Sequence, residues 1–314
     1  MSSILMSVLL TILMTALAPA IWGTTYIVTS EILPADSPFT AATIRCLPAG
    51  LLLILISRYI PKRHEWPKLI ALSALNIGCF QALLFIAAYR LSGGLAAVIG
   101  AVQPLITLGL VWLMQGERPN WLSLLASILS ITGMTLLLLS PKLDQHTAMQ
   151  WDTIGIIAAL VGAISMALGM YFSKHRQNTS SATALSIPLL AFTGWQLALG
   201  GMMLLPFSLL IDPAIPRLTH IHIAGYSYLT LVGTLLAYAL WFKGIQQLPP
   251  VAVSALGLLS PLSAIALGWI FLGERIEGTA LIGLITVLVS VLAVQWSQLL
   301  IKPSAKKSLA NTDR

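Results

Sequence analysis

The chain has 314 residues, of which 57% are hydrophobic and only 9% are charged, and its formal net charge is +7. A soluble domain carries roughly 25% charged residues, so this chain has too few polar side chains to cover a surface exposed to water. The composition therefore predicts a protein surrounded by a lipid bilayer, with no room for a separate soluble catalytic domain. The basic residues are scattered between apolar runs, which argues against a nucleic-acid partner.

Ten apolar runs have about the 20 residues that a helix needs to cross the hydrocarbon core of a bilayer. The run at the N-terminus is interpreted as a retained span, because residues 1–10 contain no Lys or Arg and so lack the basic start of a signal peptide. Lipid offers the backbone no hydrogen-bond partner, so the spans are expected to be helices. The sequence thus predicts an all-α polytopic membrane protein with ten transmembrane helices over residues 5–29, 39–58, 68–89, 92–115, 121–140, 153–173, 186–211, 222–243, 250–272 and 278–301.

The distribution of Lys and Arg between these spans predicts the orientation. With the N-terminus in the cytoplasm, twelve Lys and Arg residues fall in the cytoplasmic connections and the C-terminal tail, and four fall in the outer connections. Cytoplasmic connections normally carry the excess of positive charge. We therefore expect a multi-pass protein of the plasma membrane, the inner membrane of a bacterium, with both termini in the cytoplasm.

The most informative feature of the sequence is an internal duplication. When the chain is shifted by 157 residues, nine of the 28 residues from 91 to 118 match those from 248 to 275. The matches include three that apolar bias does not explain, namely Pro104 with Pro261, Trp112 with Trp269, and Gly116-Glu117-Arg118 with Gly273-Glu274-Arg275.

Each half of the chain holds five spans, and an odd number makes the second half enter the membrane from the opposite side. The prediction is two inverted five-helix repeats, at residues 1–146 (helices 1–5) and 147–301 (helices 6–10), followed by a cytoplasmic basic tail at 302–314. In transporters this architecture puts the substrate between the repeats near the middle of the bilayer, where exchange of their conformations alternates access. The alternative is that duplication only built a larger helix bundle.

The same residues carry a family resemblance that covers nearly the whole chain. The two runs from proline to Gly-Glu-Arg resemble the twin repeat of EamA-type proteins in the drug/metabolite transporter superfamily, and so do Ala20-Ile21-Trp22-Gly23 and residues 45–50. The resemblance implies ten helices, cytoplasmic termini, a central cavity, and export of amino acids or related metabolites. Met166 departs from the pattern, because the second repeat often has Trp at this position.

Polar and aromatic residues inside the spans are the candidates for a substrate cavity, because an amphiphilic pocket combines apolar walls with a few placed polar groups. All acidic residues and histidines fall at span ends or in loops, so the sequence names no proton carrier at mid-membrane. Arg45 lies roughly 9 Å into the second span and could extend to the outer interface, face the cavity, or pair with a neighbouring helix. The candidates are Trp22, Tyr26, Arg45, Asn76, Gln81, Gln103, Trp195, Gln196, Tyr238, Trp241 and Ser260.

Two sets of matched residues, one in each half, are candidates for movement. Pro104 and Pro261 each remove a helix hydrogen bond and could make a static kink or a hinge. The Glu117-Arg118 and Glu274-Arg275 turns are expected to cap helix ends, with a structural or gating role.

No spacing of residues suggests a metal or another cofactor, and Cys46 and Cys79 are interpreted as buried apolar residues. The favoured function is a secondary transporter that exports a small amphiphilic metabolite, with small-molecule substrate and bilayer as partners and a homodimer left open. An intramembrane enzyme is disfavoured because no G-x-S-x-G, no H-E-x-x-H and no mid-span Asp pair occurs. A membrane sensor or scaffold that transports nothing is the other alternative.

Residues 117 and 274 should lie on opposite faces of the membrane if the repeats are inverted. We expect a cysteine at 117 to react with an impermeant thiol reagent only from the cytoplasm, and a cysteine at 274 only from outside. The measurement is labelling of intact and permeabilised cells, in a background in which Cys46→Ser and Cys79→Ser remove the native thiols. Labelling of both positions from one face would rule out inverted repeats.

Overall fold

The computed structural model describes residues 2–34, 37–90, 93–116, 118–144, 152–175, 187–214, 217–272 and 278–300, and these contain helices and turns but no strand. Ten helical stretches are long and apolar enough to cross a membrane, which confirms the ten predicted spans. The largest difference is in the eighth, predicted at 222–243 and observed at His220–Gln247. The predicted span is shorter because polar residues lie at both ends of the observed helix.

The first five spans contain eight elements. They are α1 (Ser2–Glu31), α2 (Pro38–Ser57), α3 (Trp66–Ser73), the π-helical turn η1 (Ala74–Gly78), α4 (Cys79–Arg90), α5 (Gly93–Gly100), α6 (Gln103–Gln115) and α7 (Trp121–Asp144).

The last five spans repeat this order. They contain α8 (Thr153–His175), α9 (Leu189–Leu210), α10 (His220–Thr230), the π-helical turn η2 (Leu231–Leu236), α11 (Ala237–Gln247), α12 (Pro250–Leu256), α13 (Leu259–Leu272) and α14 (Thr279–Leu300).

Four spans are interrupted, at matching positions in the two halves. The third and eighth spans each contain a π-helical turn, and the first residues of these turns, Ala74 and Leu231, are 157 residues apart. The fourth span breaks after Gly100 and the ninth after Leu256, and each break is two residues long. The shift found in the sequence thus recurs in the local backbone structure.

The prolines in the fourth and ninth spans follow these breaks instead of kinking a continuous helix. Pro104 is at the N-terminal end of α6, where the missing N–H of proline costs no hydrogen bond. Pro261 lies in the first turn of α13. Each proline therefore helps to start the second half of its span.

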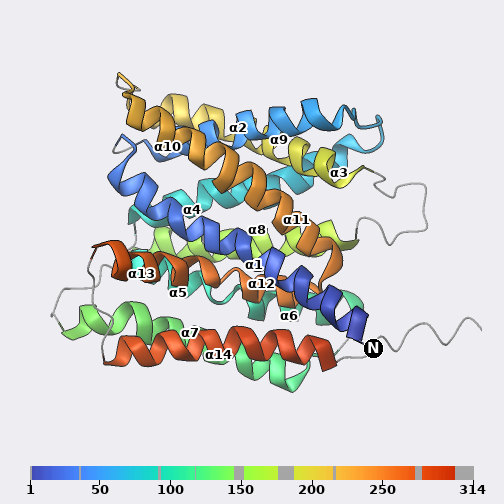
Figure 1. Ribbon diagram of the computed structural model, residues 1–314, viewed down its shortest axis with the longest axis vertical. Coiled ribbons are helices and arrows are strands. Elements are labelled where there is room, and N and C mark those ends of the chain that lie inside the picture. The colour runs from blue at the N-terminus through green and yellow to red at the C-terminus, as the bar shows by residue number, and fades with distance from the viewer. Residues whose placement is uncertain are drawn as a thin grey trace, which may run out of the picture.

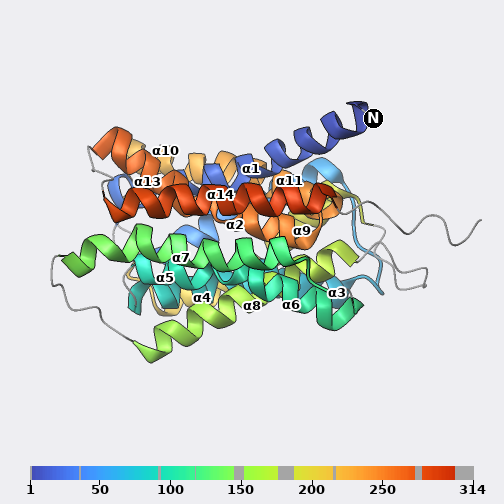
Figure 2. The ribbon, with the colours of Figure 1, turned by 90° about the horizontal axis from the view of Figure 1, so that it is seen from below.

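Helices from the two halves pack against one another in an order that fits two related repeats. α2 lies along α9, and α7 lies along α14, as both views show for the latter pair (Figure 1, Figure 2). α1 packs on α13 of the ninth span, and α8 packs on α5 and α6 of the fourth. Exchanging the halves maps the α2–α9 and α7–α14 contacts onto themselves and interchanges the other two, so the arrangement agrees with the predicted duplication.

Glycines allow close approach where corresponding helices cross. A Cβ atom on Gly283 of α14 would lie 2.4 Å from the Leu137 nitrogen of α7, and one on Gly50 of α2 would lie 2.3 Å from the Ala198 nitrogen of α9. Small residues at such crossings let the two backbones touch, and the close van der Waals packing that results holds helices together in a membrane. Both crossings between the halves therefore depend on the absence of a side chain.

Hydrogen bonds join the ends of neighbouring spans. The Asp212 carboxylate, just after α9, accepts the Thr40 N–H at the start of α2 at 2.5 Å, where a negative charge also complements the helix dipole. At the other end of the same two helices, the Trp195 indole donates to the Tyr59 carbonyl at 2.9 Å. The paired helices are thus fixed at both ends.

Arg90 and Asp152 form a third such link, between α4 and the start of α8. Their side chains are 3.1 Å apart, and Asp152 also accepts the Gly155 N–H at 2.7 Å. The hydrogen bond from Gly155, assisted by Arg90, holds the pKa of the Asp152 carboxyl below its ordinary value of 3.8. Ionised Asp152 therefore stabilises the folded protein.

Replacing Gly283 by alanine should destabilise the protein, because the new methyl group meets backbone atoms that cannot move aside. Overpacking of this kind costs about 1–3 kcal/mol. Gly109→Ala is a matched control, since a Cβ there meets nothing within 4 Å. We expect a lower midpoint of thermal unfolding in detergent for Gly283→Ala only; equal midpoints for both variants would contradict the close crossing.

The lowered pKa of Asp152 predicts a specific acid sensitivity. A carboxyl whose pKa is depressed by folding adds stability above its unfolded pKa and loses it as the pH falls through the folded value. Between about pH 6 and pH 3, the unfolding midpoint of Asp152→Asn should therefore decrease less than that of the wild-type protein. Parallel curves of midpoint against pH would show that the carboxylate is not stabilised by these contacts.

Candidate functional site

Arg45 is buried between the second and eighth spans, with only 9% of its surface exposed. Its Nε donates to the Thr234 hydroxyl at 2.9 Å, and its Nη2 donates to the Gly233 carbonyl at 3.1 Å. Of the three expectations for Arg45, the structure therefore has it paired with a neighbouring helix and not extended to the interface. Among the described residues, no carboxylate lies within 4.0 Å of its guanidinium nitrogens.

The π-helical turn η2 explains why a backbone carbonyl can accept this hydrogen bond. The Ala237 N–H donates to the carbonyls of Val232 and Thr234, and so passes over Gly233, its usual partner four residues earlier. The free Gly233 carbonyl also accepts the Trp22 indole N–H of α1 at 3.1 Å. One oxygen thus joins the first, second and eighth spans.

Aromatic rings enclose this point of contact. The Trp22 ring lies 4.9 Å from the Tyr238 ring and 5.1 Å from the Trp241 ring, measured between centroids. Trp241 is 1% exposed, and its indole N–H has no hydrogen-bond partner among the described residues. A Cβ on Gly257, at the break of the ninth span, would lie 3.7 Å from Trp241. We call Trp22, Arg45, Thr234, Tyr238 and Trp241 the Arg45 cluster.

The third span carries a counterpart of this cluster that has no charge. Asn76 lies in η1, 157 residues before Gly233, and its Nδ2 donates to Gln196 Oε1 at 2.7 Å and to the Ser173 hydroxyl at 3.0 Å. The Cys79 N–H donates to the Ala74 carbonyl and passes over Leu75, whose carbonyl accepts the Ser165 hydroxyl at 3.0 Å. In each half, a side chain of another span therefore satisfies the carbonyl that a π-helical turn leaves free.

Two atoms of this neutral group lack partners in the part of the chain that the structure describes. They are Asn76 Oδ1 and Gln196 Nε2, and both side chains are fully buried. Asn76 is held tightly, because a Cβ on Gly169 would lie 2.2 Å from its Oδ1. We call Asn76, Ser173 and Gln196 the Asn76 cluster.

The structure thus brings six of the eleven cavity candidates into two clusters and leaves the rest outside them. Gln81 is buried on α4, and Ser260 is half-buried on α13. Gln103 has its Nε2 at 4.0 Å from the Met170 sulfur. Trp195 packs its ring 4.9 Å from Trp66 and anchors the loop at Tyr59. The Tyr26 side chain lies outside what the structure describes.

Of the four predicted helix-end residues, only Arg118 lies in a described range, and it is exposed. Glu117, Glu274 and Arg275 lie outside the described residues, so the predicted gating turns stay predictions.

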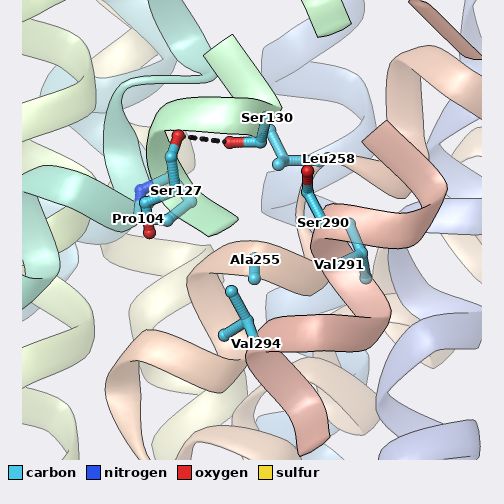
Figure 3. Close-up of a pocket in the computed structure, with 8 residues that line it drawn as sticks. All are labelled: Pro104, Ser127, Ser130, Ala255, Leu258, Ser290, Val291 and Val294. Carbon is cyan, nitrogen blue, oxygen red and sulfur yellow. Dashed lines mark hydrogen bonds between the residues drawn. The ribbon is translucent and has the colours of Figure 1, made fainter. Parts of the chain in front are cut away.

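Two spaces in the structure lie away from both clusters. A narrow gap lies between α6, α7, α14 and the ninth span, lined by the residues drawn in Figure 3, and it has no room for a water-sized sphere. Pro104 and Leu258, beside the breaks of the fourth and ninth spans, both line it. An open groove of about 360 Å³ lies between α2 and α10, lined by Ile44, Pro48 and Tyr226 among others. None of the eleven cavity candidates lines either space.

The sequence identifies the chain's relatives. Residues 9–139 and 153–296 match the pattern of the EamA-like transporter family, one stretch in each half. The chain belongs to this family. Protein PecM of Dickeya dadantii (strain 3937) is 40% identical to this EamA-like transporter over 296 residues, covering 94% of this chain and 96% of PecM.

A second relative carries a functional name. The protein called "Probable amino-acid metabolite efflux pump" in Escherichia coli (strain K12) is 26% identical, over 89% of this chain and 94% of its own length. One crystal structure superimposes with a TM-score of 0.74 over 92% of this chain and 97% of its own, and at 17% identity that likeness shows the fold alone. The family and these names indicate transport by a multi-pass membrane protein, and not catalysis.

Sequence reasoning missed several polar residues that join spans of this EamA-like transporter. Gln115 at the end of α6 approaches His175 at the end of α8, with 2.8 Å between their Nε2 atoms, and Lys174 donates to the Gln246 carbonyl at the end of α11. Thr234 and Ser173 were also missed. Serine and threonine are common inside membrane helices, so no feature of the sequence distinguishes these two from ordinary packing residues.

Proposed function

We propose that this EamA-like transporter is a secondary transporter that exports a small amphiphilic metabolite, an amino acid or a related compound. It works by alternating access between two inverted repeats, residues 1–146 and 147–301, with residues 302–314 as a cytoplasmic tail. We further propose the inner membrane of a bacterium as its location, with both termini in the cytoplasm.

The observation that carries the proposal is the set of four matched interruptions in the third, fourth, eighth and ninth spans. An unbroken helix transmits a movement along its whole length, whereas a break lets its two ends tilt separately. Interrupted helices at corresponding positions of two repeats are typical of transporters that alternate access around a central site. Packing of helices alone gives no reason for breaks at the same offset in both halves.

The chemistry of the two clusters supports an amphiphilic substrate. Apolar and aromatic side chains surround a small number of buried polar groups on both sides, which is the usual composition of a site for a small organic molecule. The name of the Escherichia coli relative supports efflux of amino-acid metabolites. Arg118 lies in the turn after the fourth span. We assign it to the proposed gating region together with Glu117, Glu274 and Arg275.

The proposal predicts that the purified protein in liposomes moves solutes. Labelled amino acids and aromatic metabolites are screened with and without a proton gradient, and protein-free liposomes are the control. We expect saturable transport of at least one compound, recovered chemically unchanged. Conversion of the compound would favour an enzyme, and the absence of transport across the whole panel would favour a sensor or scaffold.

A second experiment, in cells, addresses the direction of transport. Loss of an exporter should raise the intracellular level of its substrate, whereas loss of a sensor should leave that level unchanged. Metabolite levels in cells with and without the protein provide the measurement.

A further inference from the structure

We infer that the Arg45 cluster binds the carboxylate of a transported compound whose remaining part is aromatic. This inference rests on the proposed transport function and names the class of its substrate. The site lies where the first, second and eighth spans meet, beside the break of the ninth.

The charge of Arg45 is not balanced within the described protein. A buried ion costs several kcal/mol of desolvation unless an opposite charge compensates it, and an ionisable group within a membrane span marks a functional site. The two acceptors of Arg45, a hydroxyl and a backbone carbonyl, are both neutral. An anion bound next to the guanidinium would supply the charge that the site lacks.

The hydrogen bonds of the guanidinium leave a pair of donors for such an anion. Its five N–H groups form two forks, one along the Nε side and one at the far end between Nη1 and Nη2. Thr234 and Gly233 occupy the Nε side. The end fork has no acceptor among the described residues, and a planar fork of this kind binds a carboxylate through two parallel hydrogen bonds.

The aromatic neighbours favour a ring in the rest of the compound. Trp22 donates to the same carbonyl oxygen as Arg45, so its indole lies beside the guanidinium, and Tyr238 and Trp241 surround it. Aromatic side chains pack offset or edge-to-face against another ring. The buried N–H of Trp241 has no partner in the ranges that the structure describes, and it offers a second hydrogen bond to the compound.

Comparison with the Asn76 cluster distinguishes two possible roles of Arg45, substrate binding and helix packing. At the matching π-helical turn, η1, the neutral pair Asn76 and Gln196 fills the same position between two spans. A cation is therefore not needed to hold a π-helical turn against its neighbour. The positive charge of Arg45 is what distinguishes the second site from the first.

The test compares three acids with their own carboxamides in liposomes containing the full-length protein. The pairs are L-tryptophan, L-phenylalanine and indole-3-acetate, each against the amide that lacks the carboxylate. We expect the wild-type protein to transport at least one acid with a kcat/KM about tenfold above that of its amide. Arg45→Gln replaces the charge by a neutral amide like those of the Asn76 cluster, and it should remove this preference.

Arg90→Gln is the matched control, because it removes an exposed arginine that is outside the cluster. It should keep the wild-type preference for the acid. Arg45→Lys keeps the charge but loses the planar fork, so it should raise KM more than it lowers kcat. If Arg45→Gln does not fold, the acid-to-amide ratio of the wild-type protein and Arg45→Lys still decide the question.

Three results would overturn the inference. One is equal transport of each acid and its amide by the wild-type protein, and another is an unchanged preference in Arg45→Gln. The third is a wild-type protein that moves other solutes of the broader screen but none of these six compounds, which leaves the proposed function intact. Failure to move any solute at all would overturn both.

Discussion

The backbone carbonyl of Gly233 is the point on which the centre of this structure depends. Inside a bilayer, a carbonyl that has left its helical partner has no water to accept from, and an unsatisfied polar group there costs several kcal/mol. The π-helical turn of the eighth span frees this oxygen, and Trp22 and Arg45 both donate to it. The interruption of one span is thus stable only because two other spans supply donors.

The same requirement acts in the first half, where Ser165 donates to the free carbonyl of Leu75. The solutions differ in chemistry although the backbone feature is shared. The turn of the first half meets a hydroxyl and lies near a pair of amides, and the turn of the second half meets an indole and a guanidinium. Duplication has therefore preserved the interruption of the helix while the side chains that stabilise it have diverged, which gives the two sides of the molecule different electrostatic properties.

Sequence reasoning predicted the features that depend on length and composition. The ten spans follow from runs of apolar residues, because the thickness of the bilayer fixes how long each must be. The matched residues Pro104 and Pro261 indicated a kink or hinge in the fourth and ninth spans. The scarcity of charge within spans drew attention to Arg45. The prediction did not distinguish between the three roles of Arg45, because its partner lies 189 residues away in the chain.

The π-helical turns could not be predicted for a related reason. Residues 74–78 and 231–236 contain no proline, and the glycine and the polar residue in each do not by themselves predict a π-helical turn. Their conformation is set by the neighbouring helices, through contacts such as Asn76 with Gln196 and Thr234 with Arg45. Likewise, hydrophobicity does not reveal that Trp195 anchors a loop while Trp22 joins three spans, since both are simply tryptophans within apolar runs.

The glycine crossings of α2 with α9 and of α7 with α14 have a mechanical consequence. Backbones already in contact at Gly50 and Gly283 cannot come closer. Each crossing can therefore act as a fulcrum. Rocking of one half on the other would turn about these two fixed lines of contact.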